Sequence, residues 1–155
     1  MLDKILPRNI DNTFHGQKLA LWIFVFIVLM KIAQSLAVLF GGPFVISSAD
    51  GIPLDTYTPA AAQTVVSLWA LLGITRFLIG LLYLLVLARY RSMMPFMFGL
   101  LLLQDVGRHI VFHFIPIVRV GTPAGPTVNF VLMVLAIVGL VLSLLPNRNP
   151  PTQSA

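Results

Sequence analysis

Ionisable side chains interrupt an otherwise apolar stretch, LLLQDVGRHIVFHF, at residues 101–114. They are Asp105, Arg108, His109 and His113. Their spacing of i, i+3, i+4 and i+8 places them on one face of a helix. A carboxylate, a guanidinium and two imidazoles on one face could bind an anion or contribute ligands to a metal ion.

The composition of the chain indicates the environment of these residues. Of 155 residues, 58% are hydrophobic and 10% are charged, and the mean hydropathy is +0.95. A soluble domain has roughly 45–50% apolar and about 25% charged residues. The chain is therefore predicted to be an integral membrane protein with the lipid bilayer as its main partner. Its net charge of +5 comes from scattered basic residues, which does not fit a nucleic-acid groove.

Four apolar segments are long enough, at ~20 residues, to cross a bilayer as helices. They are expected at about 19–40, 62–88, 93–115 and 127–145. The sequence thus predicts an all-α fold, an integral membrane four-helix bundle. A cytoplasmic segment, 1–18, precedes it and a disordered tail, 146–155, follows it.

Residues that break or cap helices set the expected helix ends. Gly41-Gly42-Pro43 follows the first segment, and Pro116 and Pro146 follow the third and the fourth. Thr58-Pro59 has the residue types of a helix cap followed by a first turn. Between the first break and the second helix we expect an extracytoplasmic loop, 41–61.

The basic residues predict the orientation of these helices. One side of the membrane would carry Lys4, Arg8, Lys18, Arg89, Arg91 and Arg148. The other side would carry Arg119 with the acidic Asp50 and Asp55. Because short cytoplasmic segments are enriched in lysine and arginine, both termini are predicted to be cytoplasmic.

Three charged residues are predicted to lie near the midplane of the membrane. Lys31, Arg76 and Asp105 each stand twelve to fourteen residues from the expected start of their helix, which is ~18–21 Å into a hydrocarbon core ~30 Å thick. An ionised group there costs at least ~2.5–3.5 kcal/mol unless it faces inward and finds a partner. We therefore expect Asp105 to meet Lys31, Arg76 or both, in a core with excess positive charge.

The predicted site is a cavity between the first three helices, open to the extracytoplasmic side. Its predicted ligand-binding residues are Lys31, Arg76, Asp105, Arg108 and His109. Secondary polar residues that could add hydrogen bonds are Gln34, Thr75, Gln104 and His113. Arg108 could instead extend to the outer lipid headgroups, as long basic side chains do.

A metal site is not expected from the histidines. Imidazoles at i and i+4 can share one ion, but Asp105 and His113 stand ~12 Å apart along a helix, against ligand bonds of ~2 Å. The other three apolar segments contain no His, Asp or Glu, and the chain has no cysteine. We assign no metal and no cofactor.

The second half of the chain resembles a known group of membrane proteins. Three short motifs carry the resemblance: Arg76-x-x-x-Gly80, Gly107-Arg108 and Gly121-x-Pro123. They are similar to motifs in the small four-helix bacterial proteins grouped as DoxX-like, especially the uncharacterised branch. The resemblance covers residues 70–145 and implies a location in the bacterial inner membrane. The chain departs from that branch because its last helix has no acidic residue and its first carries Lys31.

Three functions are compatible with these residues. The first is a module that binds or helps to move a small polar or anionic molecule, or a lipid or quinone headgroup. The second is a structural or accessory subunit that assembles with other membrane proteins or with further copies of itself. The third is a membrane redox enzyme that uses His109. Since the sequence has no recognisable nucleophile–base set and no complete metal shell, no residue is assigned as catalytic.

Overall fold

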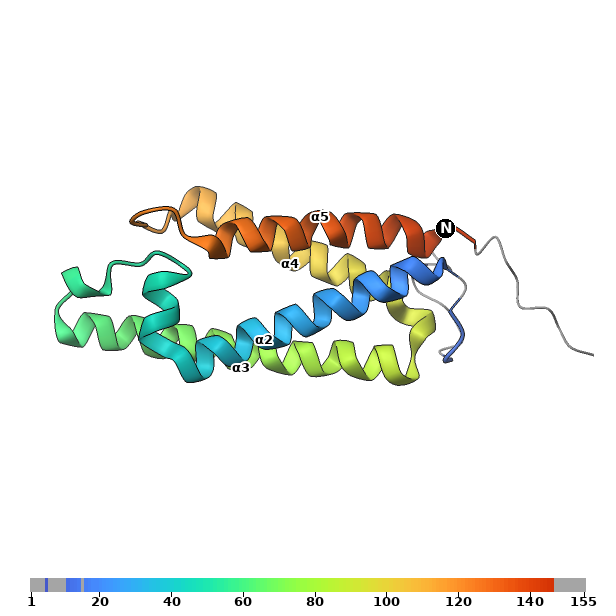
Figure 1. Cartoon of the computed structure of the whole chain (residues 1–155), viewed down its shortest axis with the longest axis horizontal. Coiled ribbons are helices and arrows are strands. Elements are labelled where there is room, and N and C mark those ends of the chain that lie inside the picture. The colour runs from blue at the N-terminus through green and yellow to red at the C-terminus, as the bar shows by residue number, and fades with distance from the viewer. Residues whose placement is uncertain (1–4, 6–10, 15, 147–155) are drawn as a thin grey trace, which may run out of the picture.

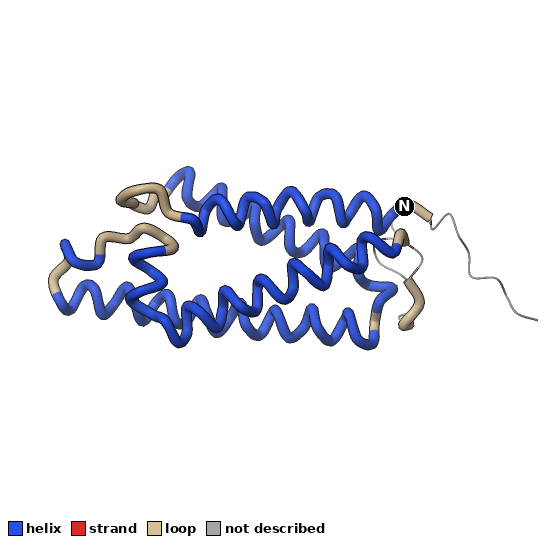
Figure 2. Tube along the Cα trace, in the orientation of Figure 1, coloured by secondary structure: helices blue, strands red, loops and turns tan. Residues whose placement is uncertain are grey.

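The computed structural model describes residues 5, 11–14 and 16–146 (Figure 1). The predicted tail after Pro146 and most of the predicted N-terminal segment lie outside this part, including Lys4, Arg8 and Arg148. Within it the chain is helical and contains no strand (Figure 2). The elements are α2 (Lys18–Ser48), the 3₁₀ helix η1 (Leu54–Thr56), α3 (Pro59–Arg89), the 3₁₀ helix η2 (Arg91–Met93), α4 (Met94–Phe114) and α5 (Ala124–Leu144).

Helix α2 is longer than the first apolar segment. The glycine–proline break expected at residues 41–43 is a kink, and the helix continues beyond it to Ser48. Gly42 has φ 19° and ψ −105°, a conformation that a residue without Cβ adopts most easily. Pro43 has no N–H to donate to the preceding turn, so the bend forms at this point.

The other helix ends follow the local signals in the sequence. The hydroxyl of Thr58 accepts a hydrogen bond of 3.4 Å from the Ala61 amide, and Pro59 occupies the first turn of α3. The predicted cap of α3 is therefore confirmed. Helix α4 ends at Phe114 and α5 at Leu144, each two residues before a proline.

The four long helices are held by aromatic and aliphatic packing. Helix α2 packs against α3 and α5, and α4 packs against α5. The ring of Phe24 on α2 meets Tyr83 of α3 edge-on at 6.0 Å and Phe98 of α4 at 5.0 Å. In contrast, α3 and α4 touch each other only sparsely, although a short turn joins them.

Glycines allow the closest helix contacts. A Cβ added to Gly80 of α3 would lie 2.7 Å from Cγ1 of Ile32 on α2. A Cβ on Gly139 of α5 would overlap the Phe98 ring of α4. Gly139 belongs to a buried small-residue face with Ala136 and Ser143. These contacts set how each helix is rotated against its neighbour.

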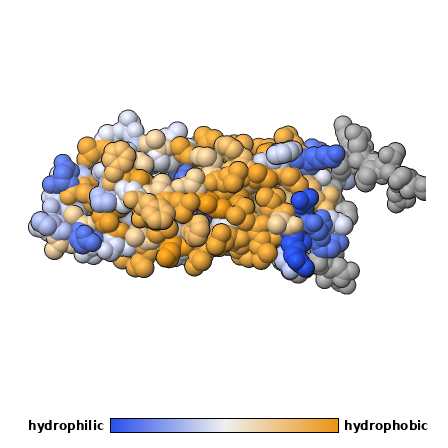
Figure 3. Space-filling model, turned by 60° about the horizontal axis from the view of Figure 1, so that its bottom comes forward, coloured by the Kyte–Doolittle hydropathy of each residue, from blue (hydrophilic) through white to orange (hydrophobic). Residues whose placement is uncertain are grey.

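The surface of the helices is that of a membrane protein. Helices α2, α3 and α5 are long and apolar enough to cross a bilayer. Helix α4, which carries the polar residues, is not among the helices that meet this criterion of length and apolarity. Large apolar side chains face outward, among them Trp22 (68% exposed) and Leu71 (63%). Figure 3 shows an apolar band across the middle of the molecule with hydrophilic residues toward both ends. A soluble protein rarely exposes so continuous an apolar surface.

The two ends of the molecule differ. At the turn end, which contains η2, the first turn of α2 lies beside the last turn of α5, and the Gln17 amide donates to the Leu142 carbonyl at 3.2 Å. At the loop end, residues 49–58 and 115–123 connect the helices. There the Gly51 carbonyl accepts from the Val120 amide at 2.8 Å.

Candidate functional site

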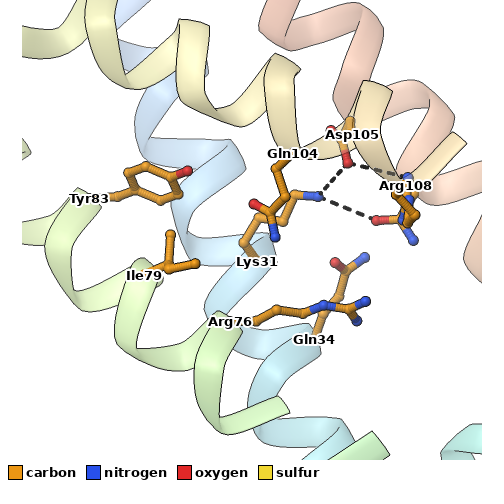
Figure 4. A pocket seen from close by; sticks show the side chains of 9 residues that line it. Lys31, Gln34, Arg76, Ile79, Tyr83, Gln104, Asp105 and Arg108 are labelled. Atoms are coloured by element: carbon orange, nitrogen blue, oxygen red, sulfur yellow. Dashed lines mark hydrogen bonds and ion pairs between the residues drawn. The ribbon is translucent and has the colours of Figure 1, made fainter. Parts of the chain in front are cut away.

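A polar cavity of about 90 Å³ lies among the four long helices (Figure 4). Its lining comprises Lys31 and Gln34 from α2, Arg76, Ile79 and Tyr83 from α3, Gln104, Asp105 and Arg108 from α4, and Asn129 from α5. A single water needs ~10–15 Å³ of such space. The cavity therefore has room for several waters or for one small polar group.

Asp105 is the centre of the charge network. Its side chain is buried, and its Oδ1 lies 3.4 Å from Lys31 Nζ and 3.2 Å from an Arg108 guanidinium nitrogen, Nη2. The first ion pair joins α2 to α4, and the second lies within α4. The structure thus shows the predicted contact of Asp105 with Lys31. The Arg108 side chain also points toward the Asp105 carboxylate rather than outward to the lipid headgroups.

Three lining residues were not predicted as site residues: Ile79, Tyr83 and Asn129. Lys31 Nζ donates to Asn129 Oδ1 at 3.4 Å, and Asn129 Nδ2 donates to the Gly125 carbonyl at 2.9 Å. Helix α5 thereby becomes part of the site. Tyr83 is 3% exposed, and its hydroxyl points toward the cavity (Figure 4). An amide in an apolar run was the available signal for Asn129, whereas Tyr83 resembles an ordinary packing residue in the sequence.

Arg76 lines the cavity without joining the charge network. Within the described residues its guanidinium makes no hydrogen bond or ion pair, and Figure 4 shows it beside Gln34 with no interaction drawn to Asp105. The expected pairing of Asp105 with Arg76 does not form. The reason is that α3 touches α4 only sparsely, so the cavity separates the two groups. Three cationic side chains consequently line a cavity that contains a single carboxylate.

Three predicted residues lie outside the cavity. His109 is exposed, its Nδ1 lies 2.8 Å from the Asp105 carbonyl oxygen, and with His113 it borders a separate apolar hollow. On a helix, residues i+3 and i+4 turn about 60° and 40° to opposite sides of residue i. The Arg108 side chain points into the cavity, so the His109 side chain faces away from it. Thr75 is exposed and donates to the Leu71 carbonyl at 3.0 Å.

The chemistry of the cavity follows from its own side chains. Comparison of the chain with protein-family models, with curated proteins and with solved structures gives no match. Within the described residues, no group of three or more His, Asp, Glu or Cys residues could hold a metal ion. Guanidinium, ammonium and amide groups converge on the cavity, and these are donors that favour an oxyanion.

Proposed function

We propose that the chain is a four-helix membrane protein that binds, or helps to move, a small polar or anionic molecule in this cavity, or the polar head of a lipid or quinone. One observation carries the proposal. Arg76 lines the cavity and has no ion pair or hydrogen bond within the described part of the chain. Because a cation inside a membrane is costly without a partner, a ligand with negative charge would compensate it.

The proposal includes α4 as the fourth membrane-crossing helix. Its 21 residues span ~31 Å, which matches a hydrocarbon core of ~30 Å. It packs along α5, and its buried Asp105 faces the interior. Polar groups directed inward allow a helix of lower hydropathy to cross a bilayer.

The proposed orientation follows the distribution of basic residues. Lys18, Arg89 and Arg91 stand at the turn end, whereas Arg119 stands at the loop end with Asp50 and Asp55. The positive-inside rule favours a cytoplasmic turn end, and hence cytoplasmic termini.

DoxX-like membership, with a location in the bacterial inner membrane, is part of the same proposal. Two motif residues, Arg76 and Arg108, line the cavity, and a third, Gly80, gives the close contact with Ile32. On this proposal the motif residues contribute to the cavity and to the packing of α3 on α2.

A structural or accessory role is the second candidate. The ion pair of Lys31 with Asp105 and its hydrogen bond to Asn129 join α2, α4 and α5. Such a network could serve only to lock the helices for assembly with other membrane proteins or with another copy. Arg76 separates the two candidates because it takes no part in the lock. Since His109 lies outside the cavity, we do not propose the redox function.

Native mass spectrometry of the purified protein in nanodiscs tests the binding function. We expect the wild type to carry a bound anionic molecule and Arg76→Gln to lose it. Removal of one charge-assisted hydrogen bond, at about 1.5–3 kcal/mol, corresponds to a tenfold or greater loss of affinity. Arg119→Gln is the control, because Arg119 lies at the loop end over the Phe112 ring, 5.5 Å from its centroid. If wild type and Arg76→Gln carry the same molecules in the same amounts, the accessory role is favoured.

A further inference from the structure

The packing of the helices leaves one side of the cavity without close helix contact. Helix α3 packs on α2, α2 on α5, and α5 on α4, but the fourth pair, α3 and α4, touches only sparsely. On this side the cavity is bordered by side chains rather than by helices in contact.

The residues at this side form two facing walls. Arg76, Ile79 and Tyr83 stand on α3 at i, i+3 and i+7, and Gln104 and Arg108 stand on α4 at i and i+4. Of the lining residues that the structure describes, Gln104 is the one that is exposed, whereas Lys31, Gln34, Arg108 and Asn129 are half-buried like Arg76 and Ile79. We call the space between these walls the lateral opening.

The surface around the lateral opening is apolar. Exposed leucines stand on both helices, including Leu78 of α3 (60% exposed) and Leu103 of α4 (67% exposed). In a membrane these side chains contact lipid, so the lateral opening faces hydrocarbon rather than water.

The loop end offers no comparably loose side. The Gly125 amide donates to the Ala49 carbonyl at 2.9 Å and the Val120 amide to the Gly51 carbonyl at 2.8 Å. Trp69 Nε1 donates to Asp50 Oδ2 at 2.9 Å, which fastens the same loop to α3. From the turn end, Lys31 and Arg76 stand thirteen residues along their helices, or ~20 Å. A soluble ion would have to travel that distance through packed side chains.

The volume of the cavity restricts what can occupy it. About 90 Å³ accommodates a phosphate or carboxylate group but not an acyl chain. A ligand with a long apolar chain would therefore leave that chain outside, in contact with the exposed leucines.

We propose that the ligand is an amphiphile with an oxyanion head, phosphate or carboxylate, which reaches the cavity sideways from the lipid through the lateral opening. The head pairs with Arg76 and Arg108, and the apolar chain stays in the bilayer between α3 and α4. This inference rests on the proposed function and specifies its ligand class and route.

Binding of defined probes to the full chain in detergent tests the ligand class. The probes are phosphatidylglycerol and oleate as anionic amphiphiles, phosphatidylcholine as a zwitterionic one, and glycerol 3-phosphate as a soluble oxyanion, each measured by native mass spectrometry and by thermal shift. We expect phosphatidylglycerol or oleate to bind at least about tenfold more tightly than phosphatidylcholine, whose added cation is repelled by the basic cavity, and than glycerol 3-phosphate, which has no apolar chain to bury.

Each result of the probe series has a separate meaning. Equal binding of glycerol 3-phosphate and phosphatidylglycerol would overturn the inference that the ligand is an amphiphile. The proposal of an anion-binding cavity would remain. Equal binding of phosphatidylcholine and phosphatidylglycerol would show lipid contact without head recognition, and would overturn the inference. Binding of none of the probes would overturn the proposed function as well.

Steric substitutions test the route without changing a charge. Ile79→Trp and Gln104→Trp narrow the lateral opening from its two walls and should each weaken binding of the anionic amphiphile by about tenfold. Leu71→Trp is the matched control, because Leu71 is 63% exposed on α3 and does not line the cavity. Unchanged binding in both wall variants, with wild-type circular dichroism, would overturn the lateral route.

Discussion

At the residue scale, Asp105 determines how the interior charges are balanced. One oxygen, Oδ1, serves both Lys31 and Arg108, while Arg76 stands across the cavity. On the proposed function, Asp105 is assigned to stability and Arg76 to binding, whereas Arg108 contributes to both. The carboxylate stabilises the helices through its ion pairs, and the guanidinium of Arg76 is available to a ligand.

Substitution of Asp105 tests its role in stability. Asp105→Asn leaves Lys31 and Arg108 without a counter-charge, since both side chains are at most 21% exposed. We expect the free energy of unfolding to fall by ~3–5 kcal/mol, measured by denaturation in mixed micelles. Adding Lys31→Met to Asp105→Asn should recover most of this loss, because it removes one unpaired cation. If the single variant unfolds like the wild type, the ion pairs do not stabilise the structure.

At the element scale, glycine contacts fix how closely the helices approach. Gly139 is the sharpest case, because its face of α5 lies directly on the Phe98 ring of α4 and near Ile23 of α2. Gly99 on α4 is different, since an added Cβ there would meet no atom within 4 Å. The two glycines form a matched pair for an identical substitution.

Alanine at these two glycines should have opposite effects. Gly139→Ala forces the ring of Phe98 to move and should destabilise the protein by ~1–3 kcal/mol. Gly99→Ala removes backbone freedom from the unfolded chain without a clash and should stabilise it by ~0.4–1 kcal/mol. Thermal unfolding followed by circular dichroism compares them. A loss of stability in Gly99→Ala equal to that in Gly139→Ala would contradict the packing described for α4 and α5.

At the scale of the whole molecule, the two ends differ in charge and construction. The turn end carries Lys18, Arg89 and Arg91, and the loop end carries hydrogen-bonded loops with a single arginine among the described residues, Arg119. The proposed orientation places the loop end outside the cell. Because the chain has no cysteine, one introduced thiol reports the location of one residue.

Thiol labelling in intact cells tests this orientation. Thr122→Cys, in the exposed loop between α4 and α5, should react with a membrane-impermeant maleimide. Ser92→Cys, in η2 at the turn end, should react only after the membrane is permeabilised. If only Ser92→Cys is labelled in intact cells, the orientation is the opposite of the one proposed.

The sequence by itself determined the class of protein, the helices and much of the polar core. Hydropathy, the Thr58 cap and the prolines after α4 and α5 act locally, so they are readable without a fold. The contact of Lys31 with Asp105 was also predictable, because two opposite charges at similar depths in apolar helices have few other partners.

The tertiary structure alone decided which side chains share the cavity. Periodicity assigns residues to a face of their own helix but does not say how that helix is rotated against its neighbours. Close contacts such as Gly80 with Ile32 set this rotation. As a result Asn129 joins the site, His109 faces away, and Arg76 stands apart from Asp105. The sparse contact of α3 with α4, which creates the lateral opening, is likewise a product of packing that no single helix encodes.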